Sequence, residues 1–184
     1  MQRRRQRISV EADENLAALD FCRLTLIPWA NDEMTTRVDV EGTLARWFAL
    51  DACSQIVVFT GPWAAWPASV FDDYATVDAA SEFMATVEPT TIAVLSQRWV
   101  SSGASPESPA AEASRGLYSF DADPGYGGQT VYFLDASPTR PLLETEAPLI
   151  LQRAAGLVRL RGIQFSTVTE IELAGLVPLV VGRG

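Results

Sequence analysis

The chain of 184 residues has the length of one ordinary domain, and its 48% apolar and 20% charged residues are typical of a folded globular protein. It contains no histidine, and all 14 basic residues are arginine. The absence of histidine and lysine excludes the Ser-His-Asp and Cys-His catalytic arrangements, histidine metal sites, the phosphate-loop lysine and lysine Schiff bases. We therefore expect a function that resides in surfaces, with no enzymatic activity and no cofactor.

Charge is distributed unevenly along the chain. The first seven residues contain four arginines, Arg3, Arg4, Arg5 and Arg7, whereas the rest carries 10 arginines and 23 acidic residues. We interpret residues 1–20 as a basic and polar arm in front of one acidic domain at 21–184. Contact of these four arginines with nucleic acid and a simple solvated terminus are equally compatible with the pattern.

The sequence also predicts where the protein resides. No run reaches the roughly 18 apolar residues of a membrane helix, and Glu11, Asp13 and Glu14 interrupt the start, where a signal peptide needs an apolar stretch. Two cysteines, Cys22 and Cys53, are too few for a disulfide framework. We expect a protein made in the cell interior that does not associate with a membrane.

In the first part of the chain, local patterns predict both strands and short helices. Alternating or β-branched residues predict strands at 21–29, 36–40, 54–60 and 90–101. Helix formers without alternation predict a helical turn at 43–50 and one or two short helices at 70–87. Between these elements, the segment GPWAAWP at 61–67 predicts an irregular loop.

The second part of the chain is expected to consist almost entirely of strands. The Ser-, Ala- and Pro-rich stretch 102–115 predicts an exposed loop. Strands are predicted at 116–121, 129–135, 148–153, 157–165, 167–173 and 176–181. With eight or nine of these ten segments counted as strands, with little helix and with no strand–helix alternation, the chain is predicted to form an all-β antiparallel sandwich or barrel.

Two loops contain candidate interaction residues. Trp63 and Trp66 lie between prolines, where they form either a docking surface for a partner or, as we favour, the roof of the core. Asp121 and Asp123 resemble the start of a calcium-binding loop, but the positions that require glycine and glutamate hold Tyr126 and Tyr132. An ordinary turn is favoured there, and a weak cation site at a subunit interface is the alternative.

Paired carboxylates offer one further possibility. Glu144 with Glu146, and Glu170 with Glu172, have the spacing of residues on one face of a strand, although a solvated face is the commoner outcome. An enzyme that uses Asp or Glu together with Arg is therefore the least favoured hypothesis. It would require a polar pocket with two converging carboxylates.

The arm and the order of strands carry a resemblance to a known class of proteins. The stretches concerned are MQRRRQR, FCRLTLIPW, SQIVVFT, TTIAVLSQRW and LVPLVV. In this pattern the chain resembles the small single-jelly-roll capsid proteins of satellite plant viruses and related icosahedral viruses. The resemblance implies a jelly-roll-like sandwich, self-assembly into a symmetric shell, and an arm that faces packaged nucleic acid in the virion.

A second hypothesis belongs to a different functional class. The acidic surface expected for the domain suits a small β-sandwich binding or immunity-type module that covers a basic protein partner. Such a module is expected to be cytoplasmic and to bind more weakly as the salt concentration rises.

Overall fold

The computed structural model describes residues 45–61, 66–122 and 130–180. Its strands are β1 (Ala45–Leu50), β2 (Ile56–Gly61), β3 (Trp66–Pro67), β4 (Ala93–Leu95), β5 (Tyr118–Ala122), β6 (Val131–Pro138), β7 (Glu170–Glu172) and β8 (Leu179–Val180). Its α-helices are α2 (Ala68–Asp72), α3 (Tyr74–Thr86), α4 (Gln97–Ser102), α5 (Glu107–Ser114) and α6 (Leu149–Gly156). Two 3-10 turns are present, η1 (Glu144–Glu146) and η2 (Phe165–Thr167).

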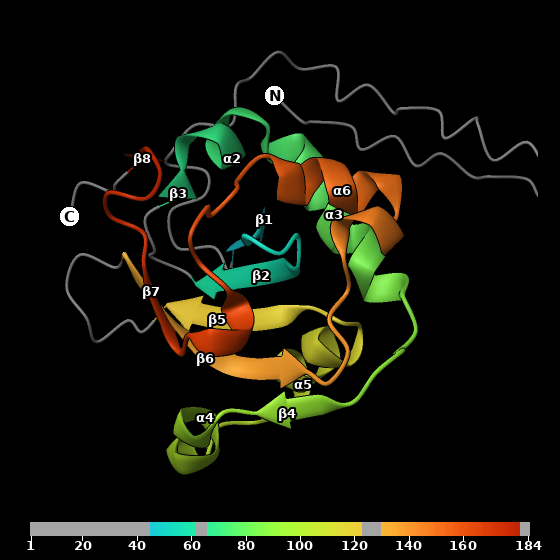
Figure 1. The fold of residues 1–184 in the computed structure, drawn as a ribbon. Helices are drawn as coiled ribbons and strands as arrows, with labels where there is room; N and C mark the ends of the chain where they lie inside the picture. Colours follow the sequence, from blue (N-terminus) through green and yellow to red (C-terminus); the bar gives the residue numbers. More distant parts are fainter. Residues whose placement is uncertain (1–44, 62–65, 123–129, 181–184) are drawn as a thin grey trace, which may run out of the picture. The chain divides into compact units, whose positions relative to one another are not determined.

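One mixed sheet organises the fold (Figure 1). Its strand order is β1-β2-β5-β6-β4, and β7 also pairs with β6, while β3 and β8 form a separate two-stranded ribbon. The neighbours β2 and β5 are parallel, whereas the other strand pairs are antiparallel. Parallel neighbours need a long crossover connection, and here that connection contains α2, α3, β4, α4 and α5.

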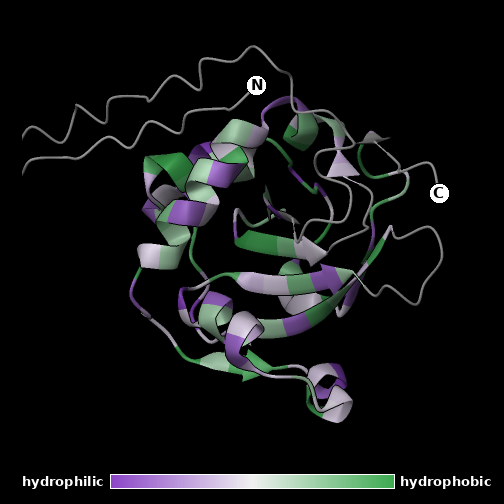
Figure 2. Ribbon diagram, turned by 180° about the vertical axis from the view of Figure 1, so that it is seen from behind, coloured by the Kyte–Doolittle hydropathy of each residue, from purple (hydrophilic) through white to green (hydrophobic). Residues whose placement is uncertain are grey.

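The helices cover different parts of this sheet. Helices α3 and α6 pack against each other and against β1, whereas α5 packs against β4, β5 and β6. Figure 2 shows β2 as an almost continuously apolar strand, while α3 and α6 carry hydrophilic residues among apolar ones. The four β2 residues at 56–59 are fully buried, as expected for a central strand that is covered on both faces.

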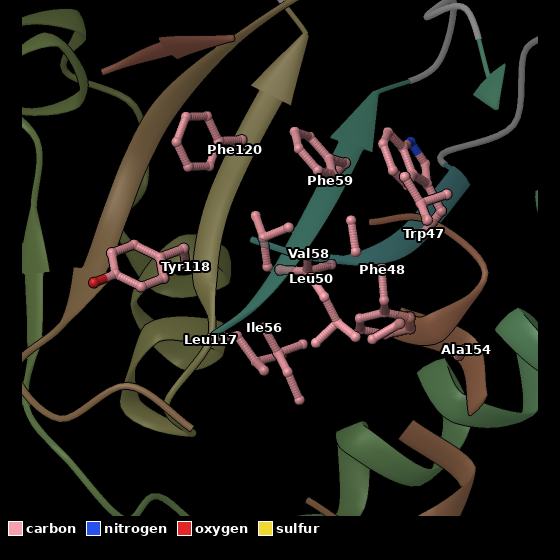
Figure 3. Packing of buried hydrophobic residues seen from close by; sticks show 14 of the residues in the cluster. Trp47, Phe48, Leu50, Ile56, Val58, Phe59, Leu117, Tyr118, Phe120 and Ala154 are labelled. Carbon is pink, nitrogen blue, oxygen red and sulfur yellow. The ribbon is translucent and has the colours of Figure 1, made fainter. Parts of the chain in front are cut away.

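A row of aromatic side chains crosses the centre of the sheet. Trp47 pairs with Phe59, and Phe59 pairs with Phe120, so the three rings lie at matched positions on β1, β2 and β5 (Figure 3). The Trp47 and Phe59 rings stack with centroids 4.1 Å apart, and the centroids of Phe59 and Phe120 are 5.7 Å apart. Such cross-strand aromatic pairs stabilise the pairing of adjacent strands.

The all-β, jelly-roll-like sandwich predicted from the sequence is wrong. The described residues contain five α-helices and one main sheet with a parallel strand pair, whereas a sandwich requires two packed antiparallel sheets. The pattern of short apolar runs misled the prediction, because such runs occur in buried helices as well as in strands.

Four segments account for most of this correction. Residues 149–153 of the expected strand 148–153 belong to α6, residues 97–101 of the expected strand 90–101 belong to α4, and residues 107–114 of the expected exposed loop form α5. The expected helical turn at 43–50 instead contains β1. The sequence did contain capping residues that mark the two ends of α4. Ser96 accepts a hydrogen bond from the Trp99 N–H at the start of the helix, and Gly103 adopts a left-handed conformation at its end.

Other predictions are confirmed. The strand expected at 54–60 corresponds to β2, and the helices expected at 70–87 correspond to α2 and α3. The arm at 1–20 and the strand expected at 21–29 lie outside the described residues. Among the helices of the described segments, none has both the length and the apolar character needed to cross a membrane.

Candidate functional site

A polar row runs across the sheet beside the aromatic row. At the next position of the strand register, Arg46 of β1 pairs with Thr60 of β2. Thr60 in turn pairs with Asp121 of β5, and Asp121 pairs with Phe133 of β6. Because successive side chains of a strand point to opposite faces, this row lies on the face opposite Trp47, Phe59 and Phe120. It lies near the carboxyl ends of the parallel strands β2 and β5, which is the edge where open α/β sheets commonly bind ligands.

A β-bulge adds a second carboxylate next to this row. The register shifts between the pairs Ser119–Ala136 and Phe120–Leu134, which makes Asp135 the extra residue on β6. Bulges are frequent next to functional sites because they re-aim a side chain. The Asp135 side chain is only 3% exposed, and its Oδ1 accepts no hydrogen bond from the residues that the structure describes.

Arg98 on α4 lies over this part of the sheet. Its guanidinium is 4.3 Å from the centre of the Phe133 ring, and its Nη1 is 3.7 Å from Asp135 Oδ1. The first contact is a cation–π interaction, while the second is longer than the roughly 2.7–2.9 Å of a strong charge-assisted hydrogen bond. The Arg98 side chain remains 42% exposed, so solvent reaches the site from the side of α4.

The environment of Asp135 changes its protonation. Burial and the negative charge of Asp121 raise the pKa of the Asp135 carboxyl, Arg98 lowers it, and together these effects bring it to about 7. The positive charge of Arg98 therefore compensates the burial of this carboxylate only in part. A carboxyl group with a pKa near neutrality exchanges its proton under physiological conditions.

The neighbouring cation in the row is already engaged elsewhere. Arg46 forms an ion pair with Glu112 of α5, with 2.8 Å between its Nη1 and Oε1, and the Glu112 side chain is buried. This contact joins β1 to α5 and neutralises Glu112.

Two adjacent carboxylates beside an aromatic ring can bind a cation. The ring attracts the positive face of a guanidinium or ammonium group, and the carboxylates accept its hydrogen bonds. A metal ion usually requires more ligands than two carboxylates. Across residues 45–61, 66–122 and 130–180, no cluster of three or more Cys, Asp or Glu side chains is arranged to hold a metal ion.

The candidate residues identified from the sequence lie in different parts of the protein. Asp121 lies in this site on β5. Trp66 lies on β3 in the hydrophobic core, with its ring centre 5.6 Å from that of Tyr74. Outside the described residues lie Arg3, Arg4, Arg5, Arg7, Trp63 and Asp123.

Sequence reasoning missed Asp135, Arg98 and Phe133 as members of the site. One signal was present, since Asp135 is an acidic residue within the apolar run VYFLDA, where a strand covered on both faces usually excludes charge. Nothing in the sequence indicated in this way that Arg98 lies near Asp135, because residues 90–101 were expected to form a continuous strand.

A separate open groove of about 610 Å³ lies on the helical side of the fold. It is lined by residues of α3, α6 and η1 together with Asp73, Leu157 and Arg159. Within it, Glu144 forms an ion pair with Arg159, while nearby Glu146 pairs with Arg140. Glu144 and Glu146, which the sequence offered as a less favoured carboxylate pair, therefore form ion pairs with different arginines and do not converge on one site.

Comparisons with known proteins supply no relative of this chain. No protein-family model, no curated protein and no solved structure matches it.

Proposed function

We propose that this domain is a binding module for a basic protein partner, with Asp121 and Asp135 at the centre of its recognition site. One observation carries the proposal: a buried carboxylate lies beside a second carboxylate and is only partly compensated by a half-exposed arginine. An arginine or lysine side chain of a partner would add positive charge beside the buried Asp135 carboxylate.

The overall charge of the protein supports the same function. The formal net charge is −9, and residues 68–88 contain five exposed acidic residues and no basic residue. The electrostatic field of this negative charge accelerates the encounter with a basic partner. The carboxylates of Asp121 and Asp135 provide the specific contact.

Binding of a fluorescent hexa-arginine peptide, followed by anisotropy, tests the proposal. Asp135→Asn should weaken binding by roughly 30-fold, equivalent to about 2 kcal/mol, because the peptide loses a desolvated charge partner. Asp78→Asn removes one exposed charge from α3 and should change the affinity by less than about twofold. Equal losses in both variants would mean that only general attraction acts, and would contradict the proposed site.

A second candidate is a virion structural role, in which copies assemble into a shell and Arg3 to Arg7 face nucleic acid. Its support is the position of β4 at one end of the sheet order, together with the exposed side chains of Ile92, Val94 and Val100. An edge strand with apolar neighbours is suited to pairing with another chain. The expectation of a jelly roll no longer supports this candidate.

Native mass distinguishes this candidate from the first. Light scattering of the full chain should report a large symmetric particle if the protein forms a shell, and Val94→Lys should dissociate it by placing a charge at the edge strand. A monomer at high protein concentration would exclude a shell and leave the binding module.

A further inference from the structure

We propose that Arg98 is an internal occupant of a guanidinium-binding subsite, and that an arginine of the basic partner displaces it. This inference rests on the proposed function and specifies its chemistry. The subsite consists of the Phe133 ring and the Asp135 carboxylate, both of which the Arg98 guanidinium contacts in the present structure, together with Asp121, which pairs with Phe133 across the strands.

The three groups match a guanidinium group. A guanidinium stacks on an aromatic face through its planar surface while its edge donates hydrogen bonds to carboxylates. Arg98 uses the first contact, at 4.3 Å from the ring centre. The ion pair between Arg98 Nη1 and Asp135 Oδ1 is loose, at 3.7 Å, and this carboxylate oxygen accepts no hydrogen bond within the described part of the chain.

Helix α4, which carries Arg98, is suited to movement. It has six residues and none of them is buried, so its displacement exposes little apolar surface. In its present position the indole N–H of Trp99 is buried and has no hydrogen-bond partner among the described residues. An unsatisfied buried donor is destabilising, and its release to water offsets part of the cost of moving α4.

An internal occupant lowers the apparent affinity of the partner. The measured dissociation constant equals the intrinsic one divided by the fraction of molecules in which the subsite is open. Removal of the Arg98 guanidinium should therefore strengthen the binding of an external guanidinium, although it removes no contact that the partner itself makes.

Peptide affinity in matched variants tests this prediction. Arg98→Ala and Arg98→Gln should bind the hexa-arginine peptide about tenfold more tightly than the wild type. Arg140→Ala is the control, because it also removes one positive charge but at an exposed ion pair with Glu146, away from the subsite. The peptide affinity of Arg140→Ala should rise by less than about twofold, since exposed ion pairs contribute little.

Two further measurements report on the mechanism. The gain should disappear in the double variant Arg98→Gln with Asp135→Asn, and it should be smaller for hexa-lysine, whose ammonium groups cannot stack as a plane. In hydrogen exchange, residues 97–102 should exchange faster in the peptide complex than in the unbound protein, because α4 has moved away from β6.

The outcomes separate this inference from the proposed function. If wild type binds and Asp135→Asn does not, while the Arg98 variants gain no more than Arg140→Ala, the inference is overturned and the binding module stands. If only the Arg98 variants bind, the inference is supported and the wild-type subsite is closed. If no variant binds the peptide, both proposals fail; unchanged far-UV circular dichroism excludes misfolding as the cause.

Discussion

At the scale of single residues, Asp135 links stability to pH. Its pKa is raised from the ordinary value of 3.8 to about 7 by burial and by the charge of Asp121, while Arg98 opposes the shift. The folded state therefore holds a proton that the unfolded state releases at lower pH. The resulting stabilisation is fully present below about pH 4 and is lost as the pH rises through about 7.

The first prediction follows from this linkage. Between pH 4 and pH 8, the free energy of unfolding should fall by roughly 2 kcal/mol more in the wild type than in Asp135→Asn, which cannot ionise. One pKa unit corresponds to about 1.4 kcal/mol, and access of solvent beside Arg98 reduces the full effect. Urea unfolding at several pH values measures the difference, and parallel pH profiles would contradict the assignment.

Asp51 has a structural role at the same scale. It is buried in the turn between β1 and β2, where Oδ1 accepts hydrogen bonds from the backbone N–H groups of Cys53 and Gln55, both at 2.8 Å. Its Oδ2 accepts the N–H of Phe165 at 3.1 Å, which attaches the distant η2 segment to this turn. One carboxylate thus fixes a local turn and a long-range contact.

The second prediction concerns this carboxylate. Asp51→Ala should lower the free energy of unfolding by about 3 kcal/mol, because it leaves three backbone donors without their charged acceptor. Asp72→Ala, at an exposed position on α2, should change it by less than about 0.5 kcal/mol. Urea denaturation at pH 7 measures both, and a neutral effect of Asp51→Ala would show that water replaces the carboxylate.

At the scale of elements, the end of α5 depends on a glycine. Gly116 has a φ of +91°, and a Cβ atom there would lie 2.9 Å from Leu142 Cβ and 3.1 Å from Leu142 N. The Leu142 N–H also donates to the Gly116 carbonyl oxygen at 2.8 Å. The chain therefore requires glycine at this position, both for the left-handed conformation and for the close approach of the 142 backbone.

The third prediction compares this glycine with one that differs only in its surroundings. Gly103 also has a positive φ, of +71°, but a Cβ there would meet nothing within 4 Å. Gly103→Ala should lower the free energy of unfolding by about 1 kcal/mol through backbone strain alone. Gly116→Ala should lower it by about 3 kcal/mol, because overpacking against Leu142 is added to the strain. Thermal unfolding of both variants measures the difference, and equal costs would exclude the steric contribution of Leu142.

At the scale of the whole molecule, self-repulsion of the net charge of −9 opposes the compact state. The fourth prediction is that the free energy of unfolding at pH 7 rises as NaCl is increased from about 10 mM to 150 mM, because salt screens this repulsion. The ion pairs at Arg140 and Arg159 are partly exposed and contribute little in the opposite direction. A steady fall with salt would mean that ion pairs dominate.

Several local features of this protein could be predicted from its amino-acid sequence. It predicted β2 from a β-branched apolar run, and α2 and α3 from helical spacing, since these patterns match the period of the element that forms. It also identified Asp121 as a candidate residue, and it established the acidic charge. These properties depend on neighbouring residues or on composition.

The architecture and the composition of the site, in contrast, depend on contacts between distant parts of the chain. The run at 148–153 is compatible with a strand and with a buried helix, and packing of α6 against α3 and β1 selects the helix. Asp135 reaches Arg98 and the neighbourhood of Asp121 because β5 and β6 pair with a bulge and α4 packs against β6. Pairing and packing join residues that are distant along the chain, so no local pattern predicts them.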